Sequence, residues 1–215
     1  MSKREKKIIG LIGFIGSGKD TAADYLVEQH NFTRLSFAGT LKDAVAAVFG
    51  WDRELLEGKT DEARTWRECV DEWWANRLRM PQLTPRWVLQ QWGTEVCRRN
   101  FHDDIWIASV EHKLAAIEDD IVISDCRFPN EIIAIHKQGG IVGRVMRGPD
   151  PGWFSLAVAA NNHAHPYYSQ SKKMFDDLNI HPSESAWIGS RMDFEIDNNS
   201  SLDQLYEKVE ELIFT

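Results

Sequence analysis

The sequence predicts an α/β fold in which helices cover both faces of a parallel sheet. Three stretches, KIIGLIGF (7–14), IVISD (121–125) and IVGRVM (141–146), are nearly continuous apolar runs, which are typical of strands buried on both faces. Segments with helical character lie between them, and this alternation favours parallel strands joined by helices. The first run leads directly into a glycine-rich stretch and a helix, which is the junction found in phosphate-binding folds.

The first half of the chain predicts elements whose ends are marked by glycine and proline. They are a helix (20–30), a strand (32–38), a helix (41–50), a charged, Trp-rich helical region (52–79), a loop (80–85) and a helix (86–99). Gly50 is a natural helix terminator. Two prolines make the 80–85 segment a loop.

The second half continues the alternation and then departs from it. It predicts a helix (105–120), a strand (121–125), a helix with a glycine end (129–140), a strand (141–146), a strand (193–196), a turn (198–201) and an amphipathic helix (202–213). Residues 148–190 have no strong periodicity and are too long for an ordinary connection. This segment is expected to be either a functional lid or a loosely ordered insertion.

Composition narrows the class of protein. The chain has 215 residues, 43% of them hydrophobic, which suits one domain over residues 1–215. A net charge of −8 argues against a general binder of nucleic acid or of anionic membranes. Cys69, Cys97 and Cys126 are odd in number and lack metal-site spacing, so reduced thiols are expected. With no signal peptide or membrane span recognised, we expect a cytoplasmic protein.

The glycine-rich stretch GFIGSGKDT nearly matches the phosphate-binding motif G-x-x-x-x-G-K-[ST]. Its glycines, Gly13, Gly16 and Gly18, allow successive backbone N–H groups to converge on phosphate oxygens, and the following helix adds its positive end. Lys19 is placed to reach the β- and γ-phosphates of a donor. The alternative is a strand-to-helix turn that binds no ligand. If the loop binds phosphate, the predicted fold is a P-loop NTPase-like parallel sheet.

Asp20 stands where the motif has Ser or Thr, and the hydroxyl falls one place later, at Thr21. Three roles are open to Asp20. Its carboxylate can bind Mg²⁺ through water, pair with a basic side chain, or favour the first turn of the helix.

Candidate acceptor residues lie at strand ends and on one helix. Lys42 opens a helix after the second strand, at the carboxyl edge where ligands bind, or is a solvated surface lysine. Arg86 and Gln90, four residues apart on one helical face, suit a monophosphate and a base edge, or Arg86 caps a neighbouring helix. Trp106 stacks on a base or belongs to the core.

Asp125 and Arg127 follow the buried strand IVISD. Asp125 is placed to hold Mg²⁺ or its water, and Arg127 points toward the mouth of a pocket at the sheet edge. Alternatively, the two side chains pair with each other. Arg144 and Arg147 stand at the entry of the 148–190 segment, where a cationic lid would exclude water from phosphates.

Seven segments together resemble the deoxynucleoside monophosphate kinases of tailed bacteriophages. In chain order they are GFIGSGKDTAADYL, FAGTLKDA, RWVLQQWGTE, FHDDIWI, SDCRFPNE, VMRGP and HPSESA. They carry the family pattern G-K-D-T, Q-x-x-G-T, D-x-R and H-x-[ST]-E. The likeness extends from Lys7 to Ile213, apart from residues 52–80 and 149–179. Gly148 departs from it, since a proline is expected there.

The resemblance implies a P-loop kinase that transfers the ATP γ-phosphate to a deoxynucleoside 5′-monophosphate with Mg²⁺. It implies that Asp20 is normal for the family. The implied catalytic residues are Lys19, Asp125 and Arg127, and the implied metal ligands are Thr21 and Asp125. ATP is expected on Gly13, Gly16, Ser17, Gly18, Lys19, Asp20, Thr21 and Arg147. The acceptor is expected on Lys42, Arg64, Arg86, Gln90, Gly93, Thr94, Trp106, Asp125 and Arg127.

Together these expectations describe one domain with a helical acceptor-binding segment around 50–100 and a lid-like insert around 148–190. The partners expected are ATP and a deoxynucleoside monophosphate, without nucleic acid polymer or membrane, in a monomer or homodimer. If the chain is phage-encoded, its compartment is the host cytoplasm. Two other functions stay open: another small-molecule P-loop kinase, such as one acting on dephospho-coenzyme A, or a non-catalytic nucleotide-binding regulator.

Overall fold

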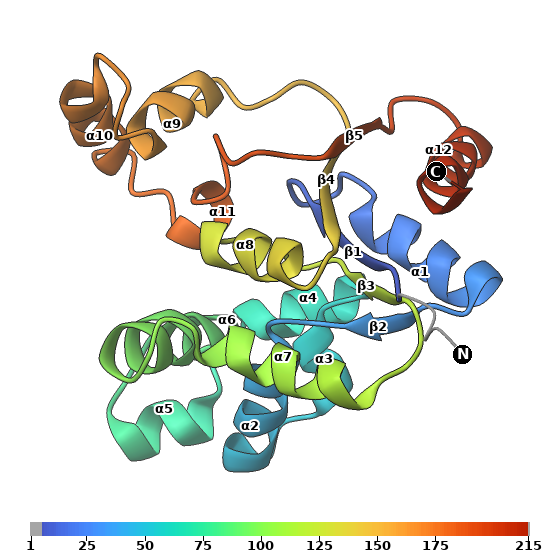
Figure 1. Ribbon diagram of the computed structural model, residues 1–215. Coiled ribbons are helices and arrows are strands. Elements are labelled where there is room, and N and C mark those ends of the chain that lie inside the picture. The colour runs from blue at the N-terminus through green and yellow to red at the C-terminus, as the bar shows by residue number, and fades with distance from the viewer. Residues whose placement is uncertain (1–5, 215) are drawn as a thin grey trace. The chain divides into compact units, whose positions relative to one another are not determined.

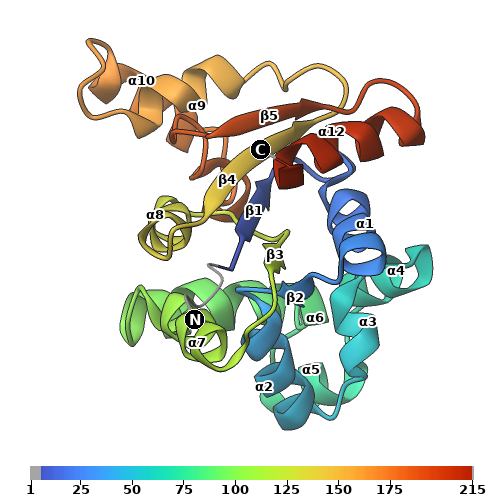
Figure 2. The same cartoon turned by 45° about the vertical axis from the view of Figure 1, so that its right-hand side comes forward.

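A computed structural model describes residues 6–214 and contains a five-stranded, all-parallel sheet (Figures 1 and 2). The strand order is β2-β3-β1-β4-β5. The strands are β1 (Ile8–Ile12), β2 (Thr33–Leu35), β3 (Ile121–Ile123), β4 (Ile141–Met146) and β5 (Phe194–Asp197). The predicted α/β fold with a parallel sheet is therefore confirmed.

The chain divides into two compact units. The sheet unit comprises the described residues up to Leu35 and those from Ile117 onward, and the helical unit comprises Ser36–Ala116. The five strands all belong to the sheet unit.

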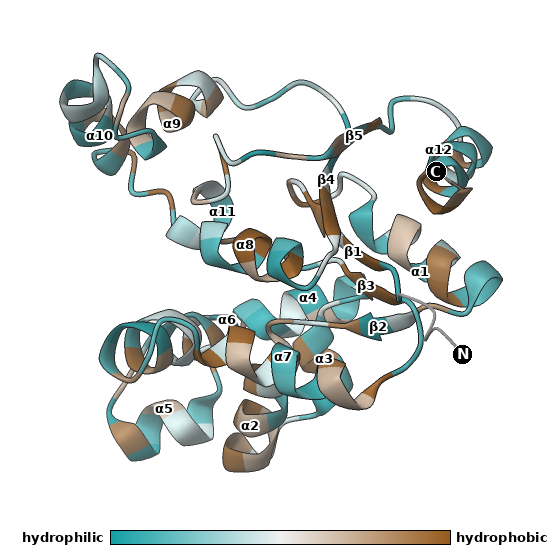
Figure 3. Cartoon of the chain, viewed as in Figure 1, coloured by the Kyte–Doolittle hydropathy of each residue, from teal (hydrophilic) through white to brown (hydrophobic). Residues whose placement is uncertain are grey.

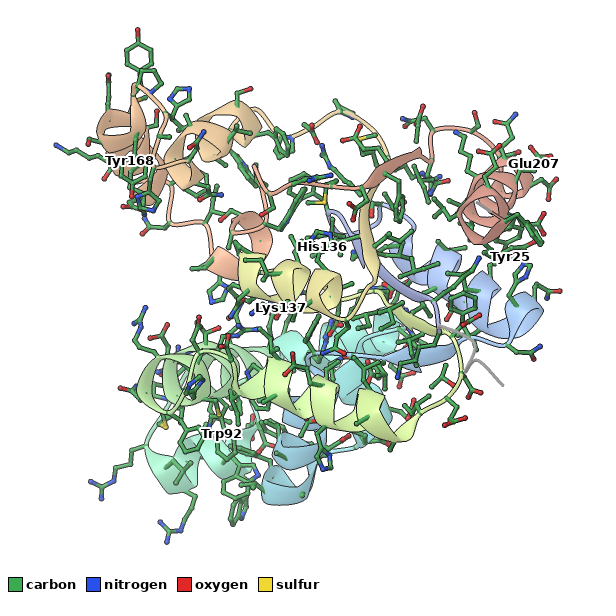
Figure 4. The ribbon with its side chains drawn as sticks, in the orientation of Figure 1. Tyr25, Trp92, His136, Lys137, Tyr168 and Glu207 are labelled. Atoms are coloured by element: carbon green, nitrogen blue, oxygen red, sulfur yellow. The ribbon has the colours of Figure 1, made fainter. Side chains whose placement is uncertain are left out.

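Helices cover both faces of the sheet within the sheet unit. α1 (Lys19–His30) and α12 (Leu202–Phe214) bury Ala23, Leu26 and Val209 against β1, β3, β4 and β5. Tyr25, labelled in Figure 4, stacks on Tyr206 of α12 with ring centroids 4.0 Å apart. α8 (Pro129–Lys137) covers the opposite face, where a Cβ on Gly10 would lie 2.7 Å from the Ile135 side chain. β1 and β3 are buried along their whole length and lack hydrophilic residues (Figure 3), as two-sided burial requires.

The helical unit is built around tryptophan and leucine side chains. Its helices are α2 (Gly39–Phe49), α3 (Arg53–Glu57), α4 (Asp61–Glu68), α5 (Glu72–Leu78), α6 (Pro85–Gln90), the π-helix η1 (Gln91–Arg99) and α7 (Ile105–Ala116). Three side-chain caps, on Asp52, Thr60 and Asp71, divide the Trp-rich region into α3, α4 and α5. Each capping side chain accepts a hydrogen bond from a backbone N–H group that would otherwise lack a partner at the start of the helix.

The predicted helix over 86–99 changes character at its middle. It begins as α6 and continues as η1, in which the backbone bonds span five residues. Gly93 lies in η1, and a Cβ there would come within 2.8 Å of Leu41. The small residue thus permits close packing of η1 against α2, at the segment where the sequence predicts acceptor contacts.

Residues 148–190 fold into helices, so the alternative of a loosely ordered insertion is wrong. They form α9 (Phe154–Asn161), α10 (Tyr168–Asp176) and α11 (Pro182–Ser185). Ala157 and Trp187 are buried. α9 has apolar residues on all sides, so its sequence lacks the helical period that would have identified it. Its role as a lid stays a prediction.

Within residues 6–214, no helix has the length and apolar character needed to cross a bilayer. The expected absence of a signal peptide depends in part on residues 1–5, which lie outside the described residues.

Candidate active site

The glycine loop lies between β1 and α1, as the motif predicts. Gly13, Gly16 and Gly18 have φ angles of 151°, 80° and 99°, which L side chains rarely adopt. A Cβ on Gly13 would lie 2.4 Å from the Val145 carbonyl oxygen, so the loop packs tightly on β4. Gly18 is the N-cap of α1, which brings the positive end of that helix to the loop. The strand, loop and helix together form a P-loop type of junction.

Lys19 is folded over this loop. Its Nζ donates a hydrogen bond to the Phe14 carbonyl oxygen at 3.2 Å. Burial lowers the pKa of Lys19, Arg127 adds to the lowering, and Asp20 and Asp125 oppose it. Groups from the first turn of α1 and from the turn after β3 therefore act on one ammonium group inside the sheet unit.

Ser17 contributes a buried hydroxyl to the same loop. The residue is 3% exposed, and its Oγ has no hydrogen-bond partner within the described part of the chain. A buried hydroxyl without a partner costs free energy, and a phosphate oxygen would relieve that cost. The loop is thus suited to an anion.

Asp20 pairs with a basic side chain, which was one of its three open roles. Arg34 of β2 donates to Asp20 Oδ1 at 2.5 Å, and the Ser124 hydroxyl donates to the same oxygen at 2.8 Å. Arg34 also bonds to Asp24, one turn further along α1. The Asp20 side chain remains 71% exposed, so one face of the carboxylate is open to solvent.

Arg34 and Ser124 are functional candidates that the sequence analysis missed. The pairing joins residues 14 positions apart, and no periodicity or motif connects them. Only the parallel pairing of β2 with β3, which sets Leu35 opposite Ile123, brings Arg34 close to the end of β3.

We expect Arg34→Met to destabilise the sheet unit by about 1 kcal/mol, since exposed charged hydrogen bonds contribute little more. The change leaves Asp20 and Asp24 as neighbouring like charges on α1. Urea unfolding measures the loss. Arg34→Lys is the matched control, because it keeps the charge but not the two-pronged geometry, and it should recover part of the stability. An unchanged midpoint for Arg34→Met would contradict this account.

Asp125 and Arg127 lie on the turn that follows β3. Glu131 of α8 fixes this turn, because its carboxylate accepts hydrogen bonds from the backbone N–H groups of Arg127 and Phe128 at 2.7 and 3.1 Å. Glu131 is the third residue of α8, a position from which glutamate commonly caps a helix start. Cys126, between Asp125 and Arg127, is buried, and burial raises the pKa of its thiol well above the ordinary range. Arg127 itself is exposed.

Two arginines near the end of β4 have opposite surroundings. Arg144 is buried, forms an ion pair with Asp150, and lies 4.6 Å from the Phe154 ring and 5.2 Å from the Trp187 ring. It is therefore part of the packing beneath α9. Arg147 directly follows β4 and is exposed. Of the two, only Arg147 has a side chain accessible to a nucleotide.

The oxygen donors predicted for Mg²⁺ are Thr21, in the first turns of α1, and Asp125, after β3. One hydroxyl and one carboxylate suit Mg²⁺, which keeps several waters and takes further ligands from substrate phosphates. The residues present therefore fit the ion.

The predicted acceptor residues, other than Asp125 and Arg127, belong to the helical unit. Lys42 is neither free nor solvated: its Nζ lies 2.5 Å from Glu57 Oε2. Burial raises the pKa of Glu57, but ion pairs with Lys42 and Arg53 more than offset this and leave it lowered. Arg86 contacts Glu68 at 3.4 Å. Arg64 is half-exposed and bonds to Asp61 and to loop carbonyls.

Trp106 and Gly93 form one structural pair in the helical unit. Trp106 is buried, and its indole N–H donates to the Gly93 carbonyl at 2.9 Å. Trp106 thus belongs to the core and supports the segment that carries Gln90 and Thr94. Base stacking by Trp106 stays a prediction.

The H-x-[ST]-E segment starts α11. The His181 Nδ1 accepts a hydrogen bond from the Ser183 backbone N–H at 3.2 Å, as an N-cap does.

Comparison with known proteins gives relatives but no matching family model. A protein of Acanthamoeba polyphaga mimivirus, provisionally named a deoxynucleotide monophosphate kinase, is 29% identical and covers 91% of this chain and 98% of its own. The deoxynucleoside-5′-monophosphate kinase of Escherichia phage T5 is 28% identical over 58% of this chain and 69% of its own. The resemblance predicted from the motifs is confirmed.

Solved structures also resemble the chain. A dephospho-CoA kinase from Campylobacter jejuni is 15% identical, covers 98% of this chain and 97% of its own, and superposes with a TM-score of 0.44. A shikimate kinase from Bacteroides thetaiotaomicron is 12% identical over 96% of each chain, with a TM-score of 0.41.

Proposed function

We propose that this chain is a deoxynucleoside monophosphate kinase, which uses ATP and Mg²⁺ to convert a deoxynucleoside 5′-monophosphate into its diphosphate. The observation that carries the proposal is Lys19, folded over a glycine loop and electrostatically coupled to Asp125 and Arg127. The names of the two sequence relatives support the choice of acceptor.

On the donor side, the loop N–H groups and the start of α1 bind the β-phosphate. Lys19 exchanges its hydrogen bond to the Phe14 carbonyl for bonds to the β- and γ-phosphate oxygens. Since Lys19 is partly desolvated before ATP arrives, its charge interacts with phosphate more strongly than it would in water. Arg147 is assigned to the same nucleotide.

In the transfer, an oxygen of the acceptor 5′-phosphate attacks the γ-phosphorus. The bond to the β–γ bridging oxygen breaks, and ADP leaves. Arg127 and Lys19 spread the charge that develops on the equatorial oxygens. Thr21 and Asp125 would hold Mg²⁺, which neutralises charge on the β- and γ-phosphates when bound.

On the acceptor side, Arg127 is proposed for the acceptor phosphate, and residues of the helical unit are proposed as further acceptor contacts. Gln90 is proposed for the base edge and Arg86 for the 5′-phosphate, because amide and guanidinium groups make two-pronged contacts with these partners. Lys42, Arg64, Gly93, Thr94 and Trp106 are proposed to complete or support this set. Lys42 must leave Glu57 to bind a phosphate, so its contribution is expected to be smaller than that of Arg86.

The partners proposed are small molecules in the cytoplasm, or the host cytoplasm for a phage-encoded chain, with no nucleic acid polymer or membrane. The protein is expected to be a monomer or homodimer, which light scattering distinguishes.

A coupled assay for ADP release over dGMP, dTMP, dCMP, dAMP and 5-substituted pyrimidine monophosphates tests the function. Turnover of at least one is expected. Release of ADP only with another acceptor, such as dephospho-coenzyme A, would favour a different P-loop kinase. Tight ATP binding without turnover of any acceptor would indicate a regulator.

The lowered pKa of Lys19 sets the alkaline limit of activity. As the pH rises through this pKa, the ammonium loses its proton and its hold on ATP. Because the free-enzyme pKa lies below the ordinary lysine value of 10.5, kcat/KM for ATP should fall at a lower pH than that. A pH profile measured with saturating acceptor checks this. A profile that stays flat beyond pH 10.5 would contradict it.

A further inference from the structure

Asn198 holds the glycine loop from a distant part of the chain. It directly follows β5, is 8% exposed, and its Nδ2 donates a hydrogen bond to the Ser17 carbonyl at 2.9 Å. The two residues are 181 positions apart in the sequence, and both belong to the sheet unit.

The position of Asn198 is itself fixed by the sheet. Its backbone N–H donates to the Met146 carbonyl at 2.8 Å, which extends the pairing of β4 with β5 by one residue. The amide also packs directly on Gly18, where a Cβ would lie only 2.2 Å from Nδ2. Both the φ angle at position 18 and the contact with Asn198 therefore require glycine there.

This contact determines how one peptide group of the loop is oriented. The Ser17 carbonyl and the Gly18 N–H belong to the same planar trans peptide and point in opposite directions. With the carbonyl held by Asn198, the Gly18 N–H must point away from Asn198. If the carbonyl were released, the peptide would be free to rotate, and the N–H would lose its fixed direction.

We propose that Asn198 is a positioning residue for the donor nucleotide, which orients the Gly18 N–H toward the ATP phosphates. Asn198 touches neither the nucleotide nor the reacting atoms. Its effect comes from preorganisation: a donor already aimed at the phosphate does not have to be ordered when ATP binds. The inference concerns the donor loop of the kinase proposed above, and it applies equally if the acceptor proves to be another molecule.

Asn198→Leu tests the proposal, since leucine is similar in size but cannot donate. Calorimetry with MgATP, without acceptor, is expected to give a dissociation constant raised about tenfold, the usual value of one well-made hydrogen bond. Asn161→Leu is the matched control. The Asn161 side chain also donates to backbone carbonyls, those of Ser185 and Ile188 at 2.8 and 2.9 Å, but at the α9–α11 packing.

The two variants separate positioning from stability. Both should lower the unfolding temperature, whereas only Asn198→Leu should weaken ATP binding. A folded Asn198→Leu protein that binds ATP as tightly as the parent, or an equal loss of affinity in Asn161→Leu, would overturn the proposal.

A measurement on the unmodified protein covers the case in which Asn198→Leu does not fold. Addition of MgADP should shift the Gly18 backbone amide proton downfield in a nitrogen-15 correlation spectrum, because the N–H then donates to a charged oxygen. An unmoved Gly18 signal at saturating MgADP would refute the assigned direction. Nucleotide binding without any acceptor turnover would instead reject only the proposed function.

Discussion

Replacing Lys19 with methionine will lower kcat on the order of a hundredfold or more, the usual loss when one charge-stabilising group is removed from a transfer site. Methionine keeps most of the buried stem and removes the ammonium group, so the packing of the loop is largely retained. The loss should appear in kcat as well as in the KM for ATP, because negative charge on the phosphate oxygens is redistributed as the transfer proceeds.

A matched control for this change is Lys172→Met. Lys172 lies on α10 and pairs with Asp176 one turn away, so the substitution removes a surface ion pair. Its kcat should stay within a factor of about two of the parent, since exposed pairs of this kind contribute little. Near-normal turnover by Lys19→Met in the steady-state assay would refute the assignment of the glycine loop to the donor phosphates.

The centre of the sheet was predictable because β1 and β3 are buried on both faces. Continuous apolar runs such as Ile8–Ile12 and Ile121–Ile123 can be recognised as strands without knowledge of the fold. α9 was not predictable by the same reasoning, because the apolar residues of its FSLAVAAN sequence are spread around the helix and show no helical period. The subdivision of residues 52–79 was readable in principle, since Asp52, Thr60 and Asp71 are each a preferred residue for a helix start.

The candidate site was predictable where a local motif defines it. The glycines, Lys19 and the turn after β3 all lie next to strand ends, so the topology of a parallel sheet gathers them at one edge. The pairing of Asp20 with Arg34 depends on strand register, and the pairing of Lys42 with Glu57 depends on the angle between two helices. No periodic pattern in the sequence marks either pairing. Asn198 was assigned only to a turn, because a hydrogen bond to a backbone carbonyl leaves no trace in the residue type of its partner.

Removal of the Arg127 guanidinium should separate acceptor from donor binding. In Arg127→Ala, the KM for the deoxynucleoside monophosphate is expected to rise about tenfold or more, since a charged hydrogen-bonding group is lost from the acceptor phosphate. The dissociation constant for MgATP should change little. The turn itself should persist, because Glu131 holds it through the backbone N–H groups of residues 127 and 128, which the substitution retains.

A second measurement on Arg127→Ala uses the effect of Arg127 on the pKa of Lys19. Arg127 lowers the pKa of Lys19, so its removal should move the alkaline limb of kcat/KM for ATP to higher pH. Arg191→Ala, a change to another exposed arginine of the sheet unit, is the control and should leave the limb unmoved. Arg127→Ala could instead lose affinity for ATP and for the acceptor equally and leave the alkaline limb unshifted. That result would mean that the substitution disturbs the fold of the loop, and it would contradict the assignment of Arg127 to the acceptor phosphate.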